Sequence, residues 1–69
     1  MVYLVFREGT DEQIAELHVD WPLIQKGEII PILVQAKESL YTVTKVGQPQ
    51  IAIDRLVVEV WVKDYFESR

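Results

Sequence analysis

The closing segment of the chain, IAIDRLVVEVWVKDYF at residues 51–66, alternates apolar and polar side chains. One parity carries a row of aliphatic residues, namely Leu56, Val58, Val60 and Val62. Such a period of two is typical of a strand with one buried face. Ile51 and Ile53 take the other parity. Because a change of parity needs an extra residue, we expect a bulge or a tight turn at Asp54–Arg55.

Three further segments have the composition of strands, namely residues 2–6, 28–34 and 40–46. Gly9 is the expected turn residue after the first of them, and residues 35–39 (QAKES) and 47–50 (GQPQ) are predicted loops. Pro31 has no N–H to donate to a neighbouring strand. The strand around it is therefore expected at a sheet edge, or with a bulge at that position.

The segment from Thr10 to Trp21 fits two structures. Thr10 and Gln13 match a helix capping box, and apolar residues at helical spacing follow them. Against this, residues 15–21 alternate strictly between apolar and polar, and Pro22 disfavours a helical conformation at Trp21. The strand is the preferred interpretation, with Trp21 at the end of its core face.

Five short strands separated by turn signals predict an all-β domain, a small closed or nearly closed barrel that spans residues 1–69 as one domain. The alternative is an α+β fold with one helix at 10–18 packed on a four-stranded antiparallel sheet. A chain of 69 residues builds a small core, and without cysteine it has no disulfide to reinforce it. Self-association is the remaining way to enlarge the core.

A strand that ends at Pro22, a short turn, Gly27 and Glu28 before two aliphatic residues, and the run LYTVTKV at residues 40–46 follow one another in this chain. This order resembles that of short uncharacterised SH3-like β-barrel proteins of bacteria and phages. The shared pattern is a strand, a proline, a short turn, Gly-Glu with two aliphatic residues, and then Tyr-x-Val-x-x-Val. The matching positions here are Pro22, Gly27, Glu28, Ile29, Ile30, Tyr41, Val43 and Val46. The resemblance covers about half of the chain. It implies the barrel architecture and no activity.

Charge limits the class of partner. Eleven acidic residues against seven basic ones give a net charge of −4. Duplex nucleic acid and anionic membranes both attract cationic surfaces, so neither is expected as a partner. The sequence has neither a signal-peptide pattern nor an apolar stretch long enough to cross a membrane, which predicts a soluble, cytoplasmic protein.

Catalytic chemistry has few candidate residues in this chain. Glu16, His18 and Asp20 alternate on one face of the expected strand, where three side chains in line converge poorly on a metal ion. The chain has no cysteine nucleophile, and its three glycines form no phosphate-binding motif. We therefore expect a non-enzymatic protein without metal or cofactor, in which these three residues form a solvated strand face.

Trp61 is the residue that points most directly to a function. If the even positions of the closing strand face the core, Trp61 and Val57 face outward, and Tyr65 and Phe66 extend the same apolar patch. Exposed aromatic side chains with a polar rim are typical of protein contacts. We expect these four residues to bind a protein partner or a second copy of the chain. In the competing interpretation, the C-terminal turn folds back and covers Trp61.

Two other functions use the same part of the sequence or the acidic residues. Trp61 with Arg55 and Lys63 would suit base stacking in single-stranded nucleic acid, although Glu59 lies on the same face. An acidic inhibitor that mimics DNA would use the carboxylates near the N-terminus, namely Glu8, Asp11, Glu12, Glu16 and Asp20. Such a group is more often a solvated surface.

Overall fold

The computed structural model describes residues 1–20 and 23–65, and these form β-strands, turns and loops without an α-helix. The six strands are β1 (Val2–Arg7), β2 (Gln13–His18), β3 (Ile29–Val34), β4 (Lys37–Val46), β5 (Gln50–Ala52) and β6 (Arg55–Asp64). The all-β prediction is confirmed, and the alternative helix at 10–18 is wrong, because β2 occupies most of that segment.

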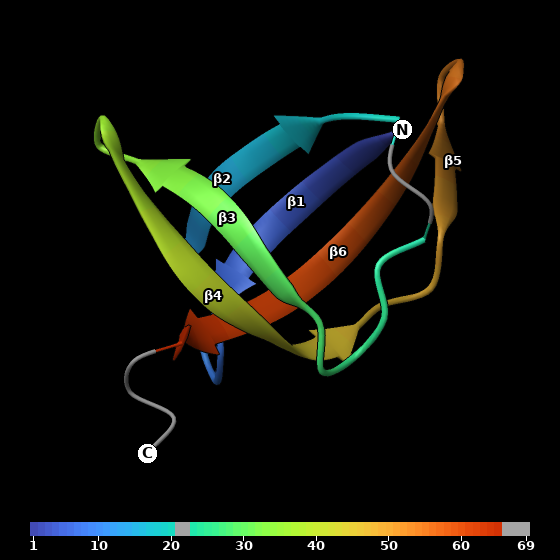
Figure 1. Ribbon diagram of the computed structural model, residues 1–69. Helices are drawn as coiled ribbons and strands as arrows, with labels where there is room; N and C mark the ends of the chain where they lie inside the picture. Colours follow the sequence, from blue (N-terminus) through green and yellow to red (C-terminus); the bar gives the residue numbers. More distant parts are fainter. Residues whose placement is uncertain (21–22, 66–69) are drawn as a thin grey trace.

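The strands form one curled sheet in the order β2-β1-β6-β4-β3, with β5 paired to β6 outside this path (Figure 1). The sheet curls so far that β2 and β3, at the two ends of the path, pack near each other. The five strands of the path correspond to the five that the sequence predicts. β6 lies at the centre, where it pairs in parallel with β1 and antiparallel with β4.

The concave, inner face of the curled sheet holds the core. Its buried cluster consists of Tyr3, Val5, Ile24, Ile30, Ile32, Tyr41, Val43, Val58, Val60 and Val62. The predicted alternation on β6 is confirmed, since Val58, Val60 and Val62 are at most 1% exposed, while Leu56, the first residue of the predicted row, is half-buried. Residues 15–20 of the second segment alternate between half-buried and exposed, as a strand on the rim of the core should. Trp21 lies outside the described residues.

Two irregularities bend the sheet. Ile14 is an extra residue in the pairing of β2 with β1, and Thr44 is an extra residue in the pairing of β4 with β6. Such bulges increase local twist and help a sheet to curl. The tight turn expected at Asp54–Arg55 is present one residue earlier, at Ile53–Asp54, because Ala52 lies opposite Arg55.

The loop predicted at residues 35–39 is only two residues long in the structure. Val34 lies opposite Lys37, so only Gln35 and Ala36 form the turn, with φ angles of 52° and 63°. Positive φ at both positions matches the twist of a two-residue hairpin. Residues 37–39 are already strand, and the charged side chains of Lys37 and Glu38 are exposed there.

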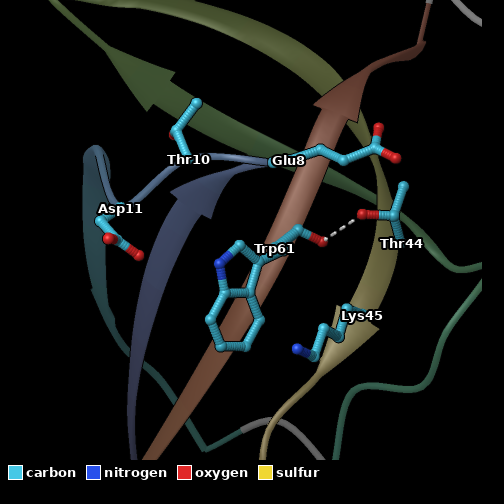
Figure 2. A pocket seen from close by; sticks show the side chains of 7 residues that line it. Glu8, Thr10, Asp11, Thr44, Lys45 and Trp61 are labelled. Carbon is cyan, nitrogen blue, oxygen red and sulfur yellow. Dashed lines mark hydrogen bonds between the residues drawn. The ribbon is translucent and has the colours of Figure 1, made fainter.

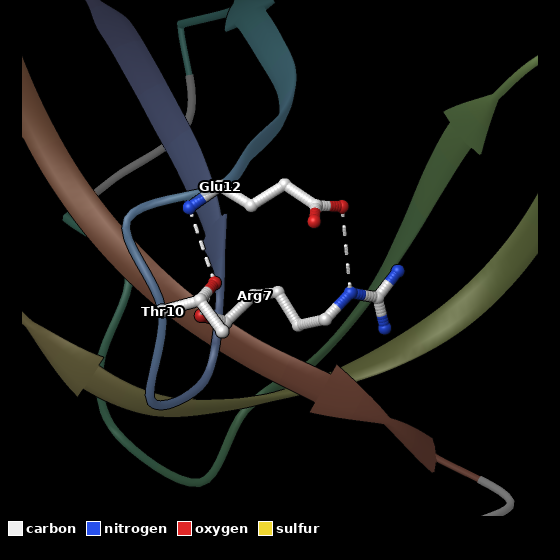
Figure 3. A network of polar contacts seen from close by, with 3 residues as sticks. All are labelled: Arg7, Thr10 and Glu12. Atoms are coloured by element: carbon white, nitrogen blue, oxygen red, sulfur yellow. Dashed lines mark hydrogen bonds and ion pairs between the residues drawn. The ribbon is translucent and has the colours of Figure 1, made fainter.

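The loop between β1 and β2 explains why the capping-box pattern does not begin a helix. Gly9 has a φ of 74°, and Thr10 Oγ1 donates to the Arg7 carbonyl at 2.9 Å and accepts from the Glu12 N–H at 3.1 Å. Arg7 Nε lies 3.8 Å from a Glu12 carboxylate oxygen (Figure 3). Thr10 therefore closes a hairpin turn, a role that competes with helix capping for this residue type.

The two strands at the ends of the main path, β3 and β2, both resist further strand pairing. The two-residue turn makes Val34 and Lys37 a hydrogen-bonded pair, so every second residue of β3 counted from Val34 bonds to β4. Pro31 belongs to the other set of residues, whose backbone groups face the open edge, and it has no N–H to offer there. The predicted edge position of Pro31 is confirmed. At the other edge, the Val19 N–H donates to the Met1 carbonyl, so Glu16 and His18 direct their backbone groups outward. Their charged side chains discourage an added strand.

Candidate functional site

Trp61 lies on the convex, outer face of the central strand and is half-buried. Phe6 lies opposite it in the register of β1 and β6, and the two ring centroids are 5.5 Å apart at an angle of 42°. Lys45 lies opposite it on β4, with Nζ 4.8 Å from the centroid of the indole ring. The indole is thus held between an aromatic ring and a cation, a favourable arrangement for its quadrupole.

A surface pocket opens beside this indole. The loop after β1 contributes Glu8, Gly9, Thr10 and Asp11 to its wall, and the central strands contribute Thr44, Lys45 and Trp61. In Figure 2 the Asp11 carboxylate and the Lys45 ammonium lie on opposite sides of the Trp61 ring. The pocket therefore combines a flat apolar surface with charges of both signs.

Local backbone structure places these side chains. The bulge at Thr44 brings Lys45 opposite Trp61, and the Thr44 hydroxyl donates to the Trp61 carbonyl at 3.2 Å. Gly47 follows β4, and its N–H donates to the Glu59 carbonyl at 2.7 Å. A Cβ at Gly47 would lie 3.2 Å from that oxygen and 3.5 Å from the Trp61 ring. A larger residue here would need the Glu59 backbone to shift by a few tenths of an ångström, so glycine suits this crossing beside the indole.

The charges that line the pocket favour a cation. Glu8 and Asp11 carry two negative charges and Lys45 one positive charge, which leaves the pocket with a net charge of −1. The whole chain carries −4. All three charged side chains are exposed, so a ligand in the pocket can contact them directly.

A second surface lies on the outer side of β3 and β4. Ile29, Pro31 and Leu33 alternate outward along β3, and Leu40 lies opposite Pro31 on β4. Ile29 is 48% exposed, Leu33 63% and Leu40 38%. Tyr65, 39% exposed, follows Asp64, which lies opposite Tyr41 beside Leu40. We call Ile29, Pro31, Leu33, Leu40 and Tyr65 the β3–β4 apolar face.

The structure divides the predicted contact residues between different places. Val57 is half-buried on the outer face opposite Val2, about 13 Å along β6 from Trp61 at ~3.3 Å per residue. Tyr65 adjoins the β3–β4 apolar face. Phe66 lies outside the described residues, and with it most of the C-terminal turn that the competing interpretation places over Trp61.

The predicted cations are also separated. Arg55 begins β6 at the hairpin with β5, about 20 Å along the strand from Trp61, whereas Lys63 is two residues from it. Lys45, the cation that does lie on the indole, comes from another strand. The sequence contains no local signal for Lys45 or Phe6, because both reach Trp61 only through the register of the central strands.

Glu16 and His18 interact on the outer side of β2. His18 Nε2 lies 2.5 Å from a Glu16 carboxylate oxygen, and both side chains are about half exposed. Among residues 1–20 and 23–65, no three His, Cys, Asp or Glu side chains are grouped so that they could hold a metal ion. The pair is a surface hydrogen bond along one strand.

Within the described part of the chain, no helix is long and apolar enough to cross a membrane. Comparison with known proteins found no matching family model, no similar curated protein and no similar solved structure. The two surfaces themselves are therefore the basis for assigning a function.

Proposed function

We propose that the protein is a non-catalytic interaction module that binds a basic segment of a partner polypeptide at the Trp61 pocket. One observation carries this proposal. The indole ring already holds a cation, the Lys45 ammonium, and the other charged groups of the pocket are carboxylates. A cation supplied by a partner would meet the same ring and the same carboxylates.

Arginine is the side chain that best fits these groups. Its planar guanidinium stacks on an aromatic ring and presents donors in a fork that matches a carboxylate. Asp11 and Glu8 supply the carboxylates and Trp61 supplies the ring. Lys45 is exposed and flexible, so its ammonium can leave the indole when the ligand arrives.

Single-stranded nucleic acid is the second candidate, because an aromatic ring beside a lysine suits base stacking with a phosphate contact. Lys45 and Lys63 would supply the cations on this face. Glu8, Asp11 and Glu59 oppose this function, since each would lie near the phosphate backbone.

The substitution Lys45→Met separates the two candidates by the sign of its effect. For an arginine ligand, Lys45 is a competitor of like charge, and its removal should tighten binding about threefold. For a nucleic acid, its removal should weaken binding, because a phosphate partner is lost. Binding is measured by NMR titration of the Trp61 indole N–H, assigned with Trp61→Phe. The probes are a glycine-flanked arginine peptide and oligo(dT).

Three controls accompany this titration. Lys37→Met removes the same charge from the same strand about 26 Å away and should leave both affinities unchanged. Replacing arginine by citrulline keeps the shape and removes the charge, and should weaken peptide binding about tenfold. Asp11→Asn should weaken it about threefold. An arginine peptide that binds no better than its citrulline counterpart would contradict the proposal.

A further inference from the structure

We infer that the β3–β4 apolar face binds a second copy of this chain in a two-fold symmetric dimer. This surface is separate from the Trp61 pocket, and the inference does not depend on peptide binding there. The aliphatic side chains of this face are well exposed, with Leu33 at 63% and Ile29 at 48%. Exposed apolar patches of this kind on a small domain mark interaction surfaces.

The apolar residues form one continuous surface because of the strand register. Pro31 and Leu40 are directly opposite each other, and Tyr65 lies beyond Leu40 on the other side. Ile29 and Leu33 extend the surface by two residues in each direction along β3. Directly opposite side chains on one face are about 5 Å apart, so these five residues are in reach of one another.

A partner cannot easily continue the sheet at this edge. Pro31 removes the N–H that would bond an added strand at the middle of β3. The side chains of the apolar face project from the sheet surface instead of along its edge. The second copy is therefore expected to pack against the face, as the two sheets of a β-sandwich do.

The charges at the two ends of the face select a second copy as the occupant. Glu38 lies opposite Leu33, at the hairpin end of the face. Lys63 lies at the other end, next to Thr42, which in turn is opposite Ile29. Consider a two-fold axis that lies between the two faces and runs perpendicular to the strands. It makes the strands of the two copies antiparallel and places the hairpin end of one copy over the Lys63 end of the other. Glu38 of each copy then faces Lys63 of its partner.

The pairing of Glu38 with Lys63 gives a surface that is complementary to itself, which a two-fold interface requires. It also offsets the repulsion between two chains that each carry −4. A domain of this size gains from such an interface, because its own core is small.

Charge reversal tests the inference. The wild type should be a dimer by sedimentation equilibrium. Each single charge reversal, Glu38→Lys or Lys63→Glu, creates two pairs of like charges in the symmetric interface. It should weaken dimerisation about fivefold to tenfold. The double variant exchanges the charges and should regain most of the wild-type affinity. Leu33→Asn should give a folded monomer with an unchanged circular dichroism spectrum.

Arg55→Glu is the matched control, because it reverses a charge of the same strand and parity about 26 Å from Lys63. It should leave dimerisation unchanged. A monomeric wild type at millimolar concentration overturns the inference, and so does a double variant no better than the single ones. The arginine-peptide titration on the same variants reports on the Trp61 pocket independently, which keeps failure of one idea distinct from failure of the other.

Discussion

At the scale of single residues, Ile53 combines an unfavourable backbone conformation with an exposed apolar side chain. It is a β-branched residue with a φ of 59°, in the turn between β5 and β6, and its side chain is 94% exposed. Left-handed backbone costs an L-residue about 1–2 kcal/mol, and β-branched residues are rare there. Ile53 gains almost no burial to offset this cost.

We therefore expect Ile53→Asn to raise the free energy of unfolding by about 0.5–1 kcal/mol, because asparagine tolerates positive φ far better. Urea denaturation followed by circular dichroism measures the change. Ile51→Asn is the matched control, since Ile51 is 83% exposed but lies in β5 without a positive φ. It should not stabilise the protein. An Ile53 variant that is no more stable than the wild type would show that the turn is not strained.

The Trp61 pocket shows which features of single residues can be predicted from the sequence and which cannot. The outward position of Trp61 follows from the alternation on its own strand, and the structure agrees with it. The contacts of Lys45 and Phe6 with the indole do not follow, because each depends on the register of a different strand. The single extra residue at Thr44 changes which side chain of β4 faces Trp61, and no composition signal marks it.

At the scale of elements, β3 is the strand whose sequence and position agree most closely. A proline in a strand predicts an edge, and β3 is an edge strand with Pro31 facing outward. The turn that follows was harder to predict, because Gln35–Ala36 lacks the Asn-Gly or Asp-Gly pattern that signals a two-residue hairpin. The tertiary pairing of β3 with β4 outweighs this local preference.

The variant Pro31→Thr should expose a complete row of backbone donors on β3 and increase association beyond the dimer through edge-to-edge strand pairing. Light scattering over a concentration series should detect higher assemblies in this variant. Pro49→Thr changes a proline in the exposed loop before β5 and should leave the mass unchanged. If Pro31→Thr keeps the wild-type mass at all concentrations, the edge is protected by something other than the missing N–H.

At the scale of the molecule, the fold depends on β6. It pairs with β1, β4 and β5, and three of its side chains belong to the buried cluster. The alternation of β6 and the all-β class could be predicted from the sequence. Its parallel pairing with β1 could not, because alternation specifies which face is buried and leaves open which strand lies alongside.

Val60→Ala should therefore reduce the free energy of unfolding by about 2 kcal/mol, since Val60 is fully buried and two lost methyl groups leave a cavity. Val57→Ala, on the same strand but half-buried on the outer face, should cost less than about 1 kcal/mol. Urea denaturation of both variants gives the comparison. Equal losses would mean that the inner face is not the principal core.

The central place of β6 has a consequence for how the chain acquires its fold. During synthesis β6 is made after the other five strands, yet β1 and β4 each need it as their neighbour. Without β6, no strand pairing connects the β1–β2 hairpin to the β3–β4 hairpin in the described part of the chain. Contacts between such distant parts of a chain make folding slow, in the range of milliseconds to seconds. Until β6 pairs with both β1 and β4, the apolar faces of these strands remain exposed to solvent.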